Sequence, residues 1–155
     1  MTIRFNLDLR NDVLSEYARR FSNGQLRIYS STLPLSVEDP VGGQLLGVCE
    51  LPDEPFTTPS NGVMSKNGVW VGEIIATNTA GWFRIFSQDF NSWLDGTVTA
   101  TGGGGDLEVD DVAFVSGNVL LVDSITISQV AYSVPPVSGN LTATEPQDVL
   151  SASYV

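Results

Sequence analysis

The segment that decides the fold runs from Gly81 to Ile127 and reads GWFRIFSQDFNSWLDGTVTATGGGGDLEVDDVAFVSGNVLLVDSITI. In this segment, short runs of alternating apolar and polar residues are interrupted every eight to twelve residues by Gly, Asn or Asp. Such a pattern is typical of antiparallel strands that show one face to a core and the other face to solvent. The segment therefore predicts a mainly β fold, namely an antiparallel β-sandwich that is jelly-roll-like.

The same patterning extends to both sides of this segment. Lys66-Asn67-Gly68 predicts a tight hairpin turn, because Asn-Gly favours positive φ angles. Trp82 and Phe83 fall on opposite faces of their strand, which predicts that both faces are covered. The expected strands span residues 3–8, 25–30, 44–51, 62–65, 69–76, 81–87, 93–100, 106–109, 119–122 and 125–132.

One helix is expected near residues 11–22. Asn11 is the candidate N-cap, acidic residues lie in the first turn, arginines lie in the last turn, and Gly24 follows as a stop signal. An apolar face recurs along this stretch with helical spacing. We expect that face to pack on the sandwich or on a neighbouring subunit.

The chain is expected to form one domain, residues 1–132, followed by an extended C-terminal arm, residues 133–155. The arm contains three prolines but keeps many apolar residues. A frayed terminus is usually more polar than this. We expect the arm to dock on a neighbouring subunit or back on its own domain, with the contacts made by Val137, Leu141, Val149, Leu150 and Tyr154.

Charge is divided unevenly along the chain, whose formal net charge is −11. Residues 1–27 carry five of the seven cations and three acids, whereas the later residues carry two cations and fifteen acids. A body this acidic repels phosphate backbones, so no nucleic-acid partner is expected. The basic end is expected to make a different contact, through Arg4, Arg10, Arg19 and Arg20. An acidic surface that only aids solubility is the alternative.

Histidine is absent and Cys49 is the only cysteine. This composition excludes a disulfide within the chain, zinc sites built from Cys and His, and histidine-based acid–base catalysis. Cys49 lies in the apolar run LLGVCEL, which predicts a buried and inert thiol. No apolar run approaches the about 18–20 residues that span a bilayer. The charged start, MTIRFNLDLRNDV, does not favour a signal peptide, and no membrane partner is expected.

The glycine-rich run TGGGGDLEVDD, Thr101–Asp111, is the most conspicuous candidate site. It is not a phosphate loop, because its glycines lead into a strand and no Lys or Arg is nearby. Carboxylates such as these are calcium ligands. However, Asp106, Glu108 and Asp110 would share one strand face, which indicates a solvated edge. We therefore predict no metal site and no cofactor.

No catalytic residues are expected. Glycoside hydrolysis needs two carboxylates held about 5 to 10 Å apart, and a pair such as Glu73 and Asp89 has no special weight in a chain this rich in acids. The serines have no base to activate them. Trp70, Trp82 and Trp93 are expected to pack in the core or between subunits rather than to form a sugar-stacking platform.

Several segments, taken in order, resemble a family of small virion structural proteins of tailed bacteriophages. The first segment, GQLRIYS, is similar to the family block G-x-L-R-I-Y-S-G and departs from it at Ser31, where the family has glycine. The resemblance spans residues 9–127 and does not include the chain after residue 132. The matching segments are Gly24–Ser30, Leu45-Leu46, Gly81–Ile85, Leu94–Val98, Asp106-Leu107 and Gly117–Ile127.

The resemblance implies a particle component without catalytic activity. On this basis we expect a capsid decoration (cement) protein, made in the host cytoplasm and bound as a homotrimer at the capsid surface of the virion. It would bridge neighbouring major capsid proteins, with its basic N-terminal segment toward the shell. The alternatives are a tail, collar or head-fibre component, and a carbohydrate-binding receptor module that exposes Trp70 or Trp93.

Overall fold

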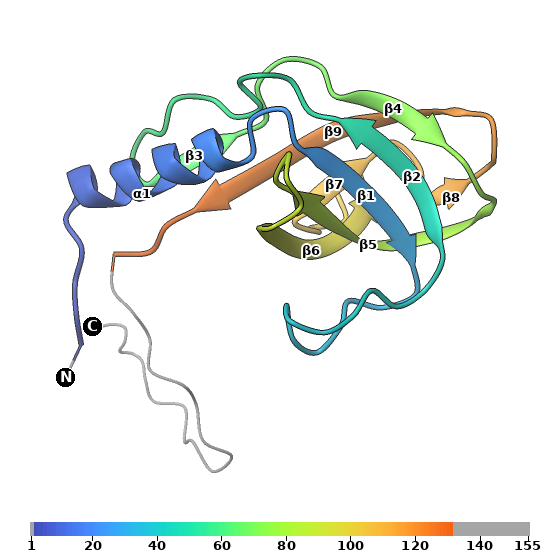
Figure 1. Ribbon diagram of the computed structural model, residues 1–155, viewed down its shortest axis with the longest axis horizontal. Coiled ribbons are helices and arrows are strands. Elements are labelled where there is room, and N and C mark those ends of the chain that lie inside the picture. Colours follow the sequence, from blue (N-terminus) through green and yellow to red (C-terminus); the bar gives the residue numbers. More distant parts are fainter. Residues whose placement is uncertain (1, 132–155) are drawn as a thin grey trace, which may run out of the picture.

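A closed β-barrel with one helix packed along it forms the fold in the computed structural model, which describes residues 2–131 (Figure 1). Seven strands make the barrel wall, in the order β1-β2-β4-β9-β7-β6-β5 with β5 pairing back to β1. The two remaining strands are additions, since β3 pairs with β9 and β8 pairs with β5. The elements are α1 (Leu7–Arg20), β1 (Gln25–Ser30), β2 (Leu45–Glu50), β3 (Val63–Ser65), β4 (Val71–Ile74), β5 (Asn78–Phe86), β6 (Trp93–Ala100), β7 (Leu107–Val109), β8 (Ala113–Phe114) and β9 (Val119–Ser128).

The predicted antiparallel β-sandwich is wrong. Strand β1 pairs with β2 on one side and with β5 on the other, so the sheet closes on itself and is not two stacked sheets. The sheet is also mixed, because β6 and β7 run parallel. Alternation along a strand reports that one face is buried, and this holds equally for a sandwich and for a barrel. The pattern does not report which strands pair.

One continuous core fills the barrel and extends beneath the helix. Leu26 and Ile28 of β1 meet Phe83 and Ile85 of β5, and all four side chains are buried. Side chains on both faces of β5 are buried, as expected from its aromatic residues. The other large buried side chains include Leu14, Phe21, Leu46, Met64, Trp70, Leu107, Leu120 and Ile125.

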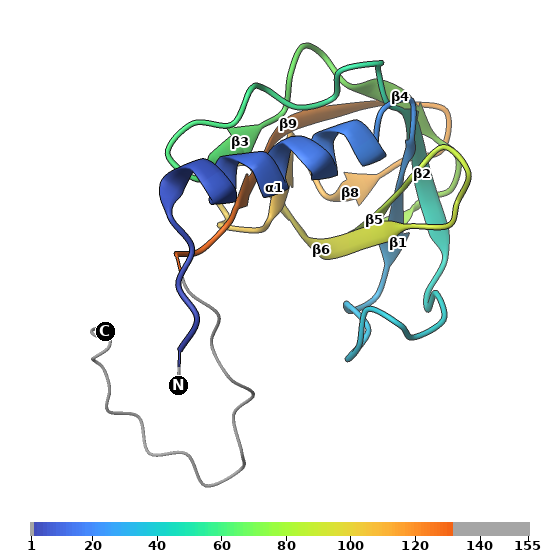
Figure 2. The ribbon, with the colours of Figure 1, turned by 60° about the vertical axis from the view of Figure 1, so that its left-hand side comes forward.

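Helix α1 begins earlier than expected. Its N-cap is Asn6, whose Oδ1 accepts a hydrogen bond from the Leu9 N–H at 3.0 Å. Asn11 is not a cap, because it lies inside the helix and its Oδ1 accepts the Gly62 N–H at 2.9 Å. No strand exists at residues 3–8, since part of that range is helical. Figure 2 shows α1 lying across the barrel in front of the strands.

Strand β9 is one continuous element where two strands were expected. Asp123 and Ser124 are exposed but remain in the strand, so the break expected between residues 122 and 125 does not occur. β9 pairs with β4, β7 and β3 along its length and is therefore the strand that closes the wall. Strand β8 was not expected from the sequence.

The predicted arm, residues 133–155, lies outside the described residues. Val137, Leu141, Val149, Leu150 and Tyr154 lie there too, so their contacts stay a prediction. Across residues 2–131, no helix is long and apolar enough to cross a membrane.

Candidate interaction surface

The outer face of β1, β5 and β6 carries a second layer of buried side chains outside the barrel. Residues directly opposite each other in a ladder point to the same face, and the register places Tyr29 opposite Trp82 and Arg84 opposite Asp95. The rings of Tyr29 and Trp82 stack with centroids 4.6 Å apart. A barrel strand that faced solvent here would carry polar residues, so this layer must be covered by another part of the chain.

Arg84 is the centre of this layer. Its Nη2 donates to Asp95 Oδ2 at 2.9 Å, and the two side chains are only 4% and 11% exposed. The guanidinium lies over the rings of Trp82 and Trp93, 5.3 and 5.5 Å from their centroids. Such cation–π contacts strengthen when the cation is shielded from water. Arg84 is thus held from three sides. Its Nε is buried without a hydrogen-bond partner, and its two terminal nitrogens are the donors that reach the loop between β1 and β2.

Those donors fix the loop between β1 and β2. Arg84 Nη2 donates to the carbonyl of Val37 at 3.3 Å, and both terminal nitrogens donate to the carbonyl of Asp39 at 3.3 Å. Trp93 Nε1 donates to the same Val37 carbonyl at 2.8 Å. Residues 31–43, named here the clamped loop, therefore cover the layer and are tied to two strands. Figure 1 shows this loop projecting from the barrel below β1 and β2.

The first residue of the clamped loop, Ser31, lies very close to β5. Ser31 has a φ of 75°, in the left-handed region that favours glycine. Gly81 lies so close that a Cβ built on it would stand 1.8 Å from the Ser31 carbonyl oxygen. The glycine at residue 81 is therefore a requirement of the close approach. Ser31 thus stands at a position where glycine would fit the backbone best.

The clamped loop exposes apolar side chains although its backbone is fixed. Leu35 is fully exposed, and Val37 and Val41 are each 42% exposed. The turn beneath them is closed by the Ser36 N–H donating to Asp39 Oδ2 at 3.0 Å. A fixed loop that exposes Leu35, Val37 and Val41 together is a candidate surface for binding another protein.

A second apolar surface lies on the outer face of β4 and β9. Val71 stands opposite Leu121 in the ladder, and both point outward. Val69 and Val119 extend this surface and are 72% and 68% exposed. These four residues are named here the valine face, and the exposed Glu73 stands opposite Val119 on the same side.

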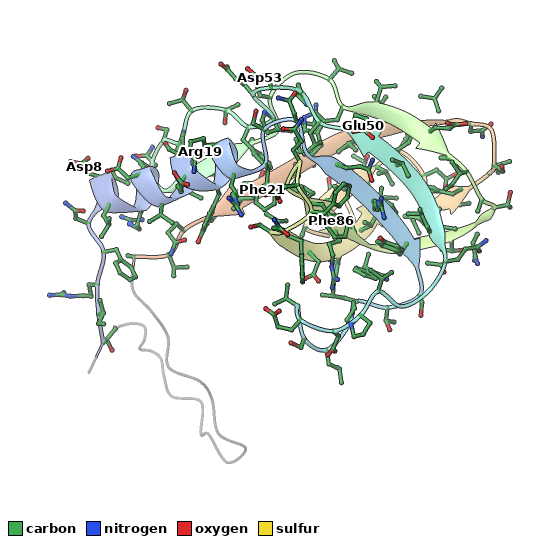
Figure 3. The ribbon with its side chains drawn as sticks, viewed as in Figure 1. Asp8, Arg19, Phe21, Glu50, Asp53 and Phe86 are labelled. Atoms are coloured by element: carbon green, nitrogen blue, oxygen red, sulfur yellow. The ribbon has the colours of Figure 1, made fainter. Side chains whose placement is uncertain are left out.

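The arginines expected to act together do not form one site. Arg10 and Arg20 are ten residues apart on α1, which corresponds to about 15 Å along a helix. Arg20 Nε donates to Ser92 Oγ at 2.9 Å. Arg19 pairs with Glu16 in its own helix, and this hydrogen bond lowers the pKa of Glu16 and raises that of Arg19. Arg4 precedes the helix, and Figure 3 shows Arg19 at the helix surface.

The acidic run after the glycines has a structural role. Asp106 Oδ2 accepts the N–H and the hydroxyl of Thr97, each at 2.9 Å, and Glu108 accepts the Gly104 N–H at 3.1 Å. Within the described residues, no group of three or more His, Cys, Asp or Glu could hold a metal ion. Strand β7 lies between β6 and β9, so the expectation of a solvated sheet edge is wrong.

The other candidate residues are separated or buried. Glu73 lies on β4, whereas Asp89 lies in the turn before β6, where a hydrogen bond from Ser87 lowers its pKa. Trp70 is fully buried and packs edge-on against Phe56, which excludes it as an exposed sugar platform. Comparison of the chain with models of protein families, with curated proteins and with solved structures gives no match.

Cys49 is buried, as predicted, and is expected to be inert. Burial, followed by the charge of Glu50, raises the pKa of its thiol to about 11. We expect an aromatic disulfide reagent at pH 8 to label Cys49 only after urea unfolds the chain. The thiol also keeps its proton to a higher pH in the folded state than in the unfolded state. The free energy of unfolding should therefore fall as the pH rises from 9.0 to about 11. Rapid labelling of the folded protein at pH 8 would contradict this assignment.

Proposed function

We propose that the chain is a non-enzymatic structural protein of a tailed-phage particle, a capsid decoration protein that binds neighbouring major capsid proteins. The segment resemblance supports the setting. The clamped loop is the single observation that supports the mode of action, because it presents the fully exposed Leu35 on a backbone fixed by Arg84 and Trp93. A tail, collar or head-fibre component would use the same loop on a different particle protein.

The energetics of the clamped loop favour binding. Complete burial of a leucine side chain is worth about 1.5–3 kcal/mol. A flexible loop would lose much of this gain through the entropy of ordering, whereas the clamped loop is already ordered by folding. Glu38 and Asp39 flank the apolar residues, and the loop has no cation. The partner surface should therefore be an apolar pocket with a cationic rim.

The valine face supports the second part of the proposal, contact between copies of the chain. Val71 and Leu121 form an exposed pair of apolar side chains, which could pack against an identical pair across a two-fold axis or against a different surface in a ring. The clamped loop is built on β1, β5 and β6, and the valine face is built on β4 and β9. One surface is thus free to bind the shell while the other binds a second copy.

Replacing Leu35 with aspartate is expected to weaken binding to capsids of the encoding phage, assembled without this protein, by at least about tenfold, or 1.4 kcal/mol. The charge enters a pocket that accepts an apolar side chain, while the fold is untouched because Leu35 packs on nothing. Co-sedimentation measures the change. Val115→Asp is the matched control, since Val115 is exposed but lies on neither surface. Equal binding by Leu35→Asp and the unsubstituted protein would refute the loop as the contact.

If the basic N-terminal segment faces the shell, the protein should leave capsids as salt rises from about 0.05 to 0.5 M, because salt screens exposed charges. Arg20→Glu is expected to lower the salt concentration at half release. Lys66→Glu makes the same charge change on the acidic body and should not. Arg20 is the informative position, because Arg19 already pairs with Glu16. Release that depends on neither salt nor Arg20 would reject this orientation.

A further inference from the structure

The barrel wall is incomplete between β6 and β9. Strand β7 is short, and it pairs with β6 only at Val98–Ala100 and with β9 only at Val122–Ile125. Residues 93–96 of β6 therefore have a strand neighbour only on the β5 side, and residues 126–128 of β9 only on the β3 side. We name the space between these two stretches the wall gap. Figure 2 shows α1 passing in front of β9.

Backbone groups on both sides of the wall gap point into it. The Thr97 N–H donates to Asp106 Oδ2, away from β5, and in an antiparallel ladder Asp95 must point the same way. On β9 the Gln129 N–H donates to Gly62 O on the β3 side, so the backbone groups of Thr126 and Ser128 point to the opposite side. No strand in the described range pairs with these groups. Two open strand edges thus face each other.

The wall gap is a cavity with room for side chains. Its volume is about 790 Å³, and its apolar lining comes from Phe21, Phe83, Leu94, Ile125 and Ile127, with Tyr17 on the helix side. Its polar rim contains Glu16, Asp95, Asp106 and Arg20, and two of the carboxylates are already paired, Glu16 with Arg19 and Asp95 with Arg84. An extended segment that adds a strand gains main-chain hydrogen bonds and places alternate side chains in such pockets. Because these rim charges are largely matched within the fold, a segment without charged residues suits the cavity.

The chain itself contains a segment with these properties. Residues 137–143, VSGNLTA, alternate apolar or small residues with polar ones and carry no charge. Val137, Gly139, Leu141 and Ala143 would share one face of an extended strand. The five residues before this segment include Pro135-Pro136, which favour a change of direction.

The end of the described chain lies within reach of the wall gap. Ala131 is three residues beyond Ser128, and its carbonyl accepts the Phe5 N–H at 2.6 Å, which fixes it beside the segment that leads into α1. To reach the wall gap, the chain must run back past the three residues that follow Ser128, a distance of about 10 Å. The five linking residues, 132–136, can span up to about 17 Å. A tethered segment also binds with an effective concentration in the millimolar range, about 1 mM or more.

We propose that residues 137–143 of the same chain fill the wall gap as an added strand, antiparallel to β9 and parallel to β6. The added strand continues the line of β7 and completes the hydrogen bonding of both open edges. Leu141 fills the apolar part of the cavity. This inference concerns the chain alone and does not depend on the proposed function.

Amide hydrogen exchange of the full-length chain, followed by NMR, tests the added strand. In the unsubstituted protein the amides of Asp95, Thr126 and Ser128 should be protected. Leu141→Asp should raise their exchange rates at least tenfold, while the Leu120 amide in the β4–β9 ladder reports that the barrel remains folded. Leu150→Asp is the matched control and should leave all four rates unchanged.

Two results would overturn the proposal. Equal exchange rates at these three amides in the unsubstituted chain and in Leu141→Asp would show that residues 137–143 do not cover them. Protection that declines as the unsubstituted chain is diluted would assign the added strand to a second copy rather than to the same chain. Light-scattering mass measured on the same samples separates these outcomes.

Discussion

Replacing Asp95 with alanine is expected to lower the free energy of unfolding by about 3–5 kcal/mol, the usual result of removing one partner from a buried ion pair. The Arg84 side chain is 4% exposed and would keep its charge with only carbonyl groups and two aromatic rings around it. Urea unfolding followed by tryptophan fluorescence measures the loss. Because Arg84 holds Val37 and Asp39, the variant should also loosen the clamped loop and weaken capsid binding.

The exposed pair on α1 provides the control for this experiment. Glu16→Ala removes a partner from Arg19, but both side chains are more than half exposed, so solvent screens the pair and its loss should barely change the free energy of unfolding. The double variant Arg84→Met with Asp95→Leu should recover most of the stability lost in Asp95→Ala, since an apolar replacement of a buried pair is often neutral. A loss below about 1 kcal/mol in Asp95→Ala would mean that water reaches Arg84.

Gly72→Ala should destabilise the barrel by about 3 kcal/mol, at the upper end for overpacking. A Cβ at this position would stand 2.1 Å from the Val48 carbonyl oxygen and 2.8 Å from the Cys49 Cα, so β2 and β4 would have to separate. Urea unfolding measures the stability, and faster labelling of Cys49 would report that the strands have moved apart.

Gly42→Ala is the control for the substitution at Gly72. No atom lies within 4 Å of the added Cβ at Gly42, and its φ is not positive, so the change should stay within about 0.5 kcal/mol. If both alanine variants unfold at the same urea concentration, the tight crossing of β2 and β4 is not a constraint on this fold.

The β content, the presence of one helix, the burial of Cys49 and the covering of both faces of β5 could be predicted from the sequence. These properties are local, since each depends on which side chains alternate or recur along one segment. The closure of the barrel could not be predicted in this way. Closure depends on the pairing of Leu26 with Ile85, residues that are far apart in the chain. An alternating pattern does not identify the strand with which a segment pairs. The helix start was missed because Asn6 and Asn11 are equally good caps by residue type.

The clamped loop was overlooked because prolines and glycines mark residues 31–43 only as a connection. One signal was available. Arg84 is one of two cations after residue 27, and it lies on a strand whose neighbours are aromatic. A lone arginine among apolar residues must find carboxylate or carbonyl partners when buried. Conversely, the uneven charge distribution indicates a contact through Arg19, but the charge of Arg19 is matched by Glu16 within one helical turn.

Strand β9 is the last element of the barrel to be synthesised, and this order has a consequence for the cell. Until its final residues leave the ribosome, β4 and β7 each have an open edge, and the side chains of Phe83 and Leu26 have no complete enclosure. The barrel therefore cannot close before β9 has emerged, which leaves an interval in which unpaired strands are vulnerable to aggregation. We expect chains that end before Val119 to be degraded or to require a chaperone, however stable the finished barrel is.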